Sequence, residues 1–401
     1  MIPGAGLRWL EALGPQTIRP GLARTRALLS ALGRPQDSFR TLLVAGTNGK
    51  GSTAATAAAV LEAAGLRVGL TTSPHLVRVN ERVRLPGGRD VSDAVLDATL
   101  SLVAAVSGEG PLRPTYFETL VVAACELFRR AGVEVAVVEV GIGGRLDATN
   151  VLEPEVSVVT NVDADHLETL GPTLADVARE KAGVFRPGHL ALTTERGGML
   201  GVLHAEAARV GADLVEVMPS AAWDDVSPLA GAHQRANVAL GVAAARALVP
   251  ADDATVRRGV AATRWPGRLQ TVPRPGARPL LVDGAHNPAG AAAVAAYLDE
   301  VGLAGRVGLV FGALGDKAVE GMFAPLAARA RQVVLVAPDS PRAVRPDALA
   351  ARLGRDDLPR AASLAEALAL LAGGEEDAPI LVAGSLVLAG EALALAGCRD
   401  A

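Results

Sequence analysis

The chain contains 401 residues, 50% of them hydrophobic, and has a formal net charge of −4 at pH 7. This length predicts two or three domains, or one large and one smaller domain, and the apolar content excludes an intrinsically disordered chain. The lack of a basic excess argues against a nucleic-acid partner. No apolar run reaches the roughly 18 residues of a membrane span. Arg8 and Glu11 interrupt the apolar pattern of residues 1–13, which predicts an amphipathic helix and not a signal peptide.

Cysteine and lysine are both scarce. Cys125 and Cys398 lie far apart, which predicts a cytoplasmic protein without a disulfide framework. Only Lys50, Lys181 and Lys317 occur among 39 basic residues. In a chain that uses arginine for ordinary cationic roles, a remaining lysine indicates a position that needs a compact, reactive amine. The alternative is that three lysines remain by chance.

Apolar strand-like segments alternate with alanine- and leucine-rich helical segments along most of the chain. Because the strand segments are β-branched and almost continuously apolar, they predict a doubly wound α/β domain with a mostly parallel sheet covered on both faces. The expected strands are 41–45, 67–71, 134–140, 156–162, 190–194 and 213–217, and the expected helices are 52–64, 92–106, 116–131, 174–183, 200–209 and 234–248.

A run of prolines and glycines at 263–279 interrupts this alternation and indicates a domain boundary. We predict a first domain at residues 1–268, a hinge linker at 269–279, and a smaller Rossmann-like α/β domain at 280–401. The strands expected in the second domain are 280–282, 307–311, 333–336 and 380–382.

The strongest local signal is LLVAGTNGKGST, residues 42–53, in which an apolar strand leads into a glycine-rich loop and then a helix. Glycines let backbone amides approach phosphate oxygens, the helix N-terminus adds partial positive charge, and Lys50 adds a full charge. The spacing departs from GxxxxGK[ST], because Val44 replaces the first glycine and Gly51 separates Lys50 from Ser52. The alternative is an ordinary glycine-rich turn. The predicted nucleotide-binding residues of this loop are Thr47, Asn48, Gly49, Lys50, Gly51 and Ser52.

Three polar residues follow this loop at positions suited to a metal-nucleotide site. Glu139 ends an apolar strand, and a carboxylate there suits the Mg²⁺ of a nucleotide, with a buried ion pair as the alternative. His166 follows the next strand and can bind a metal through a neutral ring nitrogen. Lys181 lies at a helical position, where the alternative is a salt bridge with Glu180 or Asp176.

Further polar and aromatic residues flank the same strands. Ser73 offers a hydroxyl at the end of the second strand, before a charged loop that could act as a mobile flap. Tyr116 and Phe117 stand out in an aromatic-poor chain, which indicates either a flat ligand or core packing. Arg145 and Asp147 could fix a substrate or pair with each other.

A polar cluster opens the second domain. Asp283 and His286 follow a strand, and an acidic residue at a strand end commonly contacts a ribose hydroxyl. Asn237 and Arg268 lie just before the predicted hinge. A phosphate loop in one domain and a polar cluster in the other predict a nucleotide bound between them.

A set of motifs occurs in one order: AGTNGKGST, TSPHL, NERV, TYFE, EVGIGGRLDATN, TNVDADH, EKAG, HQRAN, WPGR, DGAHNPAG and FGALGDK. Together they resemble the folylpolyglutamate synthase/dihydrofolate synthase family of the Mur ligase superfamily over residues 7–396. The resemblance implies an N-terminal P-loop ATPase domain of the Mur ligase type and a C-terminal glutamate ligase domain. Pro20 and Ala318 depart from the family pattern, at an N-terminal substrate contact and in the FGALGDK loop.

The resemblance also implies an activity, namely ADP-forming ligation of L-glutamate to a folate, and to dihydropteroate, through an acyl phosphate. A Mur-type peptidoglycan-precursor ligase is the near alternative, and a non-ligase nucleotide-binding module is the distant one. The implied cofactors are two Mg²⁺ ions and a monovalent cation, with ATP as a substrate. The implied protein is a cytoplasmic monomer whose partners are small molecules, with neither nucleic acid nor membrane among them.

Individual residues acquire roles from the resemblance. Lys181 resembles an N-carboxylated lysine, a modification that needs a neutral primary amine and is closed to arginine. The implied catalytic residues are Lys50, Lys181 and His166. The implied metal ligands are Ser73, Glu139, His166 and Lys181. The implied ATP contacts outside the loop are Asn237, Arg268, Asp283 and His286. The implied acceptor-pocket residues are Thr115, Tyr116, Phe117, Glu118 and Arg145.

Overall fold

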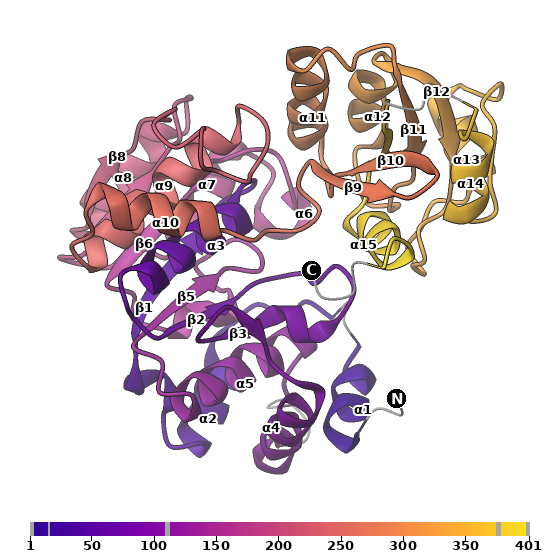
Figure 1. The fold of residues 1–401 in the computed structure, drawn as a ribbon. Coiled ribbons are helices and arrows are strands. Elements are labelled where there is room, and N and C mark those ends of the chain that lie inside the picture. The colour runs from indigo at the N-terminus through magenta and orange to yellow at the C-terminus, as the bar shows by residue number, and fades with distance from the viewer. Residues whose placement is uncertain (1–3, 15–16, 109–112, 374–377, 398–401) are drawn as a thin grey trace. The chain divides into compact units, whose positions relative to one another are not determined.

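The computed structural model describes residues 4–14, 17–108, 113–373 and 378–397. The chain divides into two units, each with its own sheet. The first unit comprises Met1–Pro228 and Gln234–Thr263, and the second comprises Leu229–His233 and Arg264–Ala401 (Figure 1). The chain therefore enters the second unit briefly before the final helices of the first.

The first unit is built on strands β1 (Arg40–Ala45), β2 (Val68–Thr71), β3 (Val83–Leu85), β4 (Arg89–Asp90), β5 (Val135–Glu139), β6 (Val156–Val159), β7 (Leu190–Thr193) and β8 (Asp213–Glu216). They form an 8-stranded sheet in the order β4-β3-β2-β5-β1-β6-β7-β8. The six strands from β2 to β8 in this order are parallel, whereas β3 and β4 form an antiparallel edge. The predicted parallel sheet is therefore confirmed, and the edge hairpin is an addition to it.

The described helices of this unit are α1 (Ala5–Ala12), α2 (Ala23–Ala31), α3 (Lys50–Ala63), α4 (Asp93–Val106), α5 (Tyr116–Arg130), α6 (Leu167–Leu170), α7 (Leu174–Ala182), α8 (Leu200–Val210), α9 (Gln234–Leu248) and α10 (Asp253–Ala262). Short 3-10 turns occupy Pro35–Ser38, Val79–Arg82 and Ala148–Val151. The predicted N-terminal amphipathic helix corresponds to α1. Helix α3, which follows the glycine-rich loop, packs against α9 and α10.

The centre of the sheet is buried on both faces. All five residues of β5 are buried, and so is every residue of β1 except Arg40. Side chains such as Leu43 and Val138 belong to the main core, and burying one such side chain stabilises the fold by about 1.5–3 kcal/mol. The neighbouring carboxyl ends of β1, β5 and β6 are therefore held on a rigid support. In an open α/β sheet this is the edge where ligands bind.

The second unit contains β9 (Gln270–Arg274), β10 (Ala277–Val282), β11 (Val307–Phe311), β12 (Ala330–Leu335) and β13 (Ile380–Ala383), with helices α11 (Pro288–Glu300), α12 (Val319–Ala327), α13 (Pro346–Leu353), α14 (Leu364–Leu370) and α15 (Leu386–Leu395). Its 5-stranded sheet has the order β12-β11-β13-β10-β9. Strands β12, β11, β13 and β10 are parallel, and β9 is antiparallel to β10. This arrangement is the smaller Rossmann-like unit that the sequence predicts.

The expected hinge at 269–279 has a different structure. These residues form most of a β-hairpin in which β9 pairs with β10. Pro273 is accommodated because β9 is an edge strand, where a missing N–H breaks no central ladder. The chain leaves the first unit at Thr263, five residues before the boundary predicted at 268.

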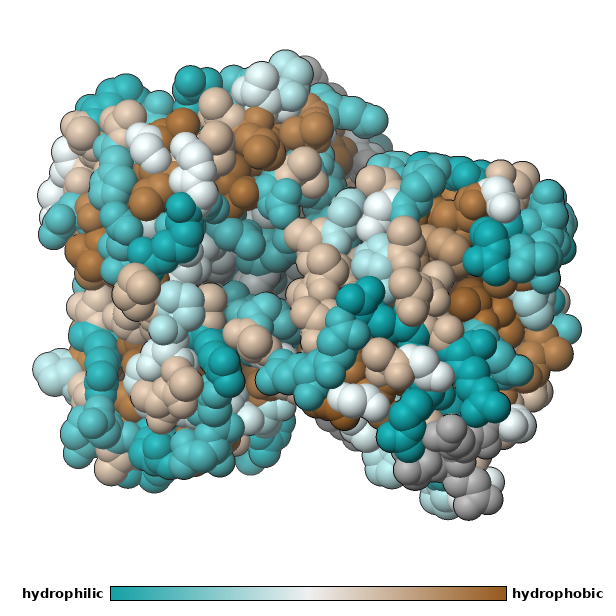
Figure 2. All heavy atoms as spheres, turned by 90° about the horizontal axis from the view of Figure 1, so that it is seen from above, coloured by the Kyte–Doolittle hydropathy of each residue, from teal (hydrophilic) through white to brown (hydrophobic). Residues whose placement is uncertain are grey.

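Apolar residues at the surface are interspersed with hydrophilic ones on the face shown in Figure 2. Large exposed apolar side chains such as Ile18 and Met218 are far apart in the chain, a normal feature of folded surfaces. In the described ranges, no helix has both the length and the apolar character needed to cross a bilayer. Cys125 is buried, and Cys398 lies outside the described residues.

Candidate functional site

The glycine-rich loop joins β1 to α3 in a backbone conformation that requires glycine at two positions. Gly46 has φ 144° and Gly49 has φ 82°. A Cβ atom on Gly46 would lie 1.8 Å from Thr160 Oγ1, and one on Gly49 would lie 2.1 Å from Asn237 Oδ1. These contacts exclude any side chain at either position. They also place Asn237, a predicted ATP contact on α9, directly against the loop.

Residues that follow β6 hold the loop in shape. The Asn48 N–H donates to Asn161 Oδ1 at 2.9 Å, and Thr160 Oγ1 donates to the Asn48 carbonyl at 2.7 Å. The Asp163 N–H donates to Thr47 Oγ1 at 3.0 Å. The loop is therefore preorganised at the N-terminus of α3, where backbone N–H groups and the helix dipole favour an anion such as a phosphate.

Two lysines share one carbonyl oxygen of this loop. Lys50 Nζ donates to the carbonyls of Gly46 at 3.1 Å and Thr47 at 3.2 Å. Lys181 Nζ, reaching in from α7, donates to the same Gly46 oxygen at 2.8 Å. Both amines of the predicted catalytic set therefore lie at the glycine-rich loop.

The Lys181 side chain is buried, with only 4% of the residue exposed. Burial, with the nearby positive charge of Lys50, lowers the pKa of Lys181 to about 7, although Asp165 opposes this change. The neutral amine is therefore accessible near neutral pH. The salt-bridge alternative does not hold, because Glu180 pairs with Arg145 and Asp176 pairs with Arg179.

Glu139 and Ser73 meet at the ends of neighbouring strands. Glu139 is 5% exposed, and its Oε2 accepts the Ser73 N–H at 2.9 Å. In the sheet register Glu139 pairs with Val44, two residues before Gly46. Glu139 and Ser73 thus lie near the glycine-rich loop, and carboxylate and hydroxyl oxygens are hard donors of the kind that Mg²⁺ prefers.

His166 precedes α6 with φ 53° and ψ 34°, and its Nε2 lies 3.8 Å from Asp165 Oδ2. Because Asp165 also acts electrostatically on Lys181, this segment lies near the lysine. Among the described residues no three His, Cys, Asp or Glu side chains form a ready metal cluster. The predicted ligand set does not need one, since it combines a carboxylate, an imidazole, a hydroxyl and a modified lysine.

Arg82 is a further charged group near Glu139, whose carboxylate acts on it electrostatically. The Arg82 Nε–H donates to His75 Nδ1 at 2.9 Å, and the Arg82 guanidinium carbon lies 5.5 Å from the centre of the Tyr116 ring. Burial, with the Arg82 charge, lowers the pKa of His75 to about 4, so the ring is neutral and can accept this bond. The sequence analysis did not identify Arg82, whose only signal is its place in the NERV motif.

In the second unit, Asp283 directly follows β10 and is 4% exposed. Its two carboxylate oxygens accept the N–H groups of Leu269 and Ala285, each at 2.8 Å. Burial raises the pKa of Asp283, and the charge of Arg268 counteracts this rise. His286 Nδ1 lies 2.9 Å from the Gly284 carbonyl. Asp283 therefore also organises its own backbone, and the ATP contacts of Arg268, Asp283 and His286 stay predictions.

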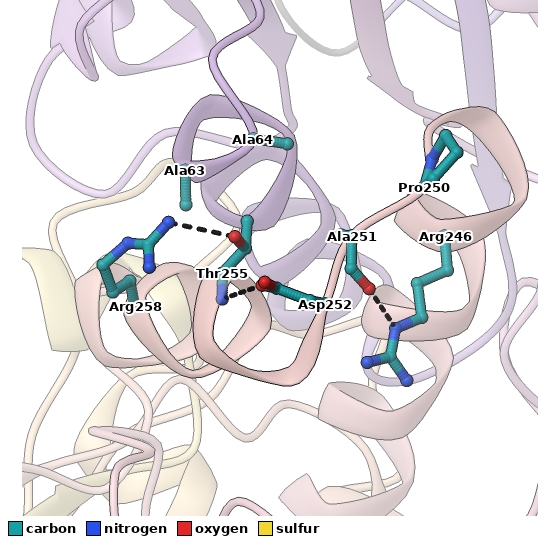
Figure 3. A pocket seen from close by; sticks show the side chains of 8 residues that line it. All are labelled: Ala63, Ala64, Arg246, Pro250, Ala251, Asp252, Thr255 and Arg258. Carbon is teal, nitrogen blue, oxygen red and sulfur yellow. Dashed lines mark hydrogen bonds between the residues drawn. The ribbon is translucent and has the colours of Figure 1, made fainter.

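A pocket in the first unit lies away from these residues. A pocket of about 710 Å³ opens where α3 ends and α9 turns into α10 (Figure 3). Its lining residues are Ala63, Ala64, Arg246, Pro250, Ala251, Asp252, Thr255 and Arg258. None of them is a predicted site residue, and the glycine-rich loop is at the opposite end of α3.

Comparison with known proteins covers both units. Residues 44–191 match the Mur ligase middle domain, and residues 267–386 match the Mur ligase glutamate ligase domain. The dihydrofolate synthase/folylpolyglutamate synthase of Mycobacterium tuberculosis is 35% identical over 98% of this chain and 93% of its own length. The chain belongs to the folylpolyglutamate synthase/dihydrofolate synthase family of Mur ligases. The resemblance carried by the ordered motifs is thus confirmed.

Other relatives of this family extend the comparison. A probable bifunctional folylpolyglutamate synthase/dihydropteroate synthase of Halobacterium salinarum is 39% identical over 96% of this chain, which spans about half (50%) of that relative. A Yersinia pestis bifunctional folylpolyglutamate synthase/dihydrofolate synthase, solved with AMPPNP and a manganese ion, aligns with a TM-score of 0.86. It is 32% identical, and the match covers 98% of this chain and 97% of that one.

The residues predicted for the acceptor pocket have other contacts in this family member. Thr115 caps α5, accepting the Glu118 N–H at 3.2 Å, while Glu118 Oε2 accepts the Thr115 N–H at 2.7 Å. Glu118 also forms a buried salt bridge with Arg24 at 2.7 Å. Arg145 pairs with Glu180 and not with Asp147. Thr115, Glu118 and Arg145 thus form hydrogen bonds or salt bridges within the protein. Their role in binding a substrate stays a prediction.

Tyr116 and Phe117 differ in exposure. Tyr116 is 7% exposed and belongs to the main core, whereas Phe117 is half-buried. A Cβ atom on Gly141 would lie 2.7 Å from Phe117 Cζ, so glycine at this position makes room for the ring. Core packing therefore explains the burial of Tyr116. Phe117, which is more exposed, is the better candidate for contact with a flat ligand.

We expect Glu118→Ala to lower the free energy of unfolding by about 3–5 kcal/mol, because it leaves the mostly buried Arg24 cation without its partner. The side chains of Arg24 and Glu118 are only 12% and 4% exposed. Glu155→Ala is the matched control, since it removes the exposed pair with Arg40 and should cost at most about 1 kcal/mol. Urea unfolding of both variants measures the difference, and equal losses would contradict the structural role of Glu118.

Proposed function

We propose that this protein catalyses ATP-dependent ligation of L-glutamate to a folate, and also to dihydropteroate, with release of ADP and phosphate. The observation that carries the proposal is the meeting of Lys50 and Lys181 on the Gly46 carbonyl, beside the Glu139 carboxylate. The match to a glutamate ligase domain and the folate-ligase relatives support the choice of substrates. They favour this activity over a peptidoglycan-precursor ligase.

The chemistry follows from the poor reactivity of a carboxylate toward an amine. A carboxylate oxygen of the acceptor attacks the γ-phosphorus of ATP, the bond from that phosphorus to the β–γ bridging oxygen breaks, and an acyl phosphate and ADP form. The glutamate α-amine then attacks the carbonyl carbon and loses a proton, and the resulting tetrahedral intermediate expels phosphate. Lys50 and the loop amides offset the charge that develops on the transferred phosphoryl group.

The residues that would hold Mg²⁺ are Ser73, Glu139, His166 and Lys181. Their donors fit the ion, since the Glu139 carboxylate is buried beside the loop and the Ser73 backbone N–H fixes its orientation. A divalent ion there would neutralise the β- and γ-phosphate oxygens of ATP. We propose two such ions, with a carboxylated Lys181 among the ligands; a monovalent cation stays a prediction. Asn237, whose side chain lies against Gly49, is the best supported of the proposed ATP contacts.

Purified protein should release ADP only when glutamate and an acceptor are both present, because no acyl phosphate is consumed without the amine and none forms without the carboxylate. A coupled ADP assay with pteroate or folate acceptors, each with and without glutamate, measures this dependence. Mass spectrometry should show the acceptor heavier by one glutamyl residue. Turnover on a muramyl substrate with none on pterin acceptors would overturn the proposal.

A further inference from the structure

Arg82 lies at the end of the 3-10 turn Val79–Arg82 and is half-buried. Burial lowers the pKa of Arg82, while Tyr116, Glu139 and Glu81 counteract this effect. The cation is therefore costly to place here unless an anion compensates it. The carboxylates that act on the Arg82 charge are Glu139 and Glu81, and both have other contacts.

Both carboxylates, Glu81 and Glu139, already accept hydrogen bonds from backbone N–H groups. Glu81 accepts the N–H groups of Leu76 at 2.6 Å and Val77 at 2.8 Å. Glu139 accepts the N–H of Ser73. In the described part of the chain, no salt bridge joins the Arg82 guanidinium to either one.

The Arg82 guanidinium makes two contacts with neighbouring side chains, a hydrogen bond from Nε and a cation–π contact. Its Nε–H donates to His75 Nδ1 at 2.9 Å, and its guanidinium carbon lies over the Tyr116 ring, 5.5 Å from the ring centre. No hydrogen bond from the terminal nitrogens to a described residue accompanies these contacts. The terminal nitrogens are the ones that bind a carboxylate or phosphate through paired, charge-assisted hydrogen bonds.

The neighbours of Arg82 belong to two parts of the proposed site, one for the acceptor and one for the γ-phosphoryl group of ATP. Tyr116 begins α5, next to Phe117, the residue best placed to contact a flat acceptor. Glu139 and Ser73 lie at the phosphate loop, where the γ-phosphoryl group of ATP would be. The carboxylate of the acceptor must lie between its ring system and that phosphoryl group when it attacks. Arg82 interacts with both parts, because its guanidinium contacts Tyr116 and the Glu139 carboxylate acts on its charge.

We propose that Arg82 binds the reacting carboxylate of the acceptor and continues to bind the same group once it has become an acyl phosphate. The inference rests on the proposed function and assigns Arg82 a catalytic role within it. Arg82 remains protonated throughout and exchanges no proton. Its hydrogen bond to His75 and its cation–π contact with Tyr116 restrict the guanidinium, so that position and charge are both set before the acceptor arrives.

The first test compares an acceptor acid with its neutral amide. Binding of pteroate and of its carboxamide is measured calorimetrically with ADP present and without added Mg²⁺, so that the metal cannot supply the carboxylate contact. Wild-type protein should bind the acid more tightly, and Arg82→Met should lose about 10- to 100-fold in affinity for the acid while binding the amide as before. A purely structural role would weaken both ligands equally.

The second test is kinetic and uses a matched neighbour. Arg82→Met should lower kcat/KM for the acceptor by at least about tenfold, Arg82→Lys should restore only part of it, and added guanidinium should partly rescue Arg82→Met. Arg84→Met is the control, because Arg84 lies two residues away and faces Asp90 at 3.6 Å. Its kinetics should match wild type, and a loss there equal to that of Arg82→Met would mean general damage to the edge hairpin.

The outcomes separate the two proposals. If wild-type protein joins glutamate to the acceptor and Arg82→Met keeps both its preference for the acid and its kcat/KM, the role of Arg82 is overturned and the function stands. If wild-type protein releases no ADP with acceptor and glutamate, the function itself fails. Thermal unfolding of every variant checks that lost activity is not lost structure.

Discussion

Lys50→Ala should lose nearly all turnover and keep its fold. Lys50 Nζ contacts two loop carbonyls and is not part of the main core, so its removal creates no large cavity. In the reaction the amine would turn to the phosphate oxygens of ATP, where no other group of the loop carries a full positive charge. Losing this interaction should cost about 3–5 kcal/mol of transition-state stabilisation.

Single-turnover and steady-state measurements of kcat, together with the thermal unfolding midpoint, test this expectation. Arg258→Ala is the control, because it removes a cation near the opposite end of α3, beside Ala63 (Figure 3). It should leave kcat unchanged. A Lys50→Ala enzyme with near wild-type kcat would show that the loop does not bind the transferred phosphoryl group as proposed.

Much of the fold could be predicted because parallel strands leave a simple pattern. β1, β5 and β6 are buried on both faces, so their sequences are nearly continuous apolar runs. The β3–β4 edge was not predicted, since β3 has 3 residues and β4 has 2, and charged side chains such as Arg84 and Asp90 face each other across the hairpin. A strand this short that is held by pairing at an edge gives almost no periodic hydrophobic signal.

The boundary between the units shows a similar limit. Prolines and glycines at 263–279 predicted a linker, but a hairpin whose outer strand, β9, is the edge of the sheet accommodates such residues equally well. The short excursion of Leu229–His233 into the second unit could not be predicted either, because it depends on long-range packing. Local composition marks an interruption of regular structure without showing which unit the residues join.

The site was predictable where chemistry restricts the residue type. Gly46, Gly49 and Lys50 are identified by backbone geometry and charge. Thr115 and Glu118 were assigned to a substrate pocket through resemblance, although a threonine followed three residues later by glutamate at a helix start is also the signature of a capping box. Arg82 gave no signal beyond its place in the NERV motif, because its contacts with His75 and Tyr116 form only in the folded chain.

Lys181→Arg should be nearly inactive, although it preserves a positive charge. We propose that the Lys181 amine reacts with carbon dioxide to give a carbamate, which loses a proton and becomes an anionic metal ligand. An ammonium beside Lys50 and a divalent ion would be repelled by both. The carbamate reverses the sign of the charge, and its nitrogen keeps one N–H that can still donate to the Gly46 carbonyl, as Lys181 does now.

The environment of Lys181 favours carbamate formation because it favours the neutral form of the amine. Only a neutral amine attacks carbon dioxide, and the pKa of Lys181 is lowered to about 7 by burial and by Lys50, so that roughly half of the amine is neutral near pH 7. An exposed lysine, with a pKa of about 10.4, would be almost fully protonated there. Carbamate formation at Lys181 should therefore decline as the pH falls below about 7, where the amine becomes protonated.

The decisive comparison uses four forms of the protein. Lys181→Arg and Lys181→Ala should both lose activity, and a small carboxylic acid added in solution should partly rescue only Lys181→Ala, because it restores the missing carboxylate in the space that the alanine leaves. Arg179→Ala is the matched control on α7, since Arg179 pairs with Asp176 at the surface. Carbon NMR with labelled bicarbonate should detect one carbamate in wild type and in the control, and none in the Lys181 variants. An unmodified ammonium in a crystal with metal and nucleotide bound, together with a fully active Lys181→Arg enzyme, would refute the assignment, because a guanidinium cannot supply the anionic oxygens that the metal requires.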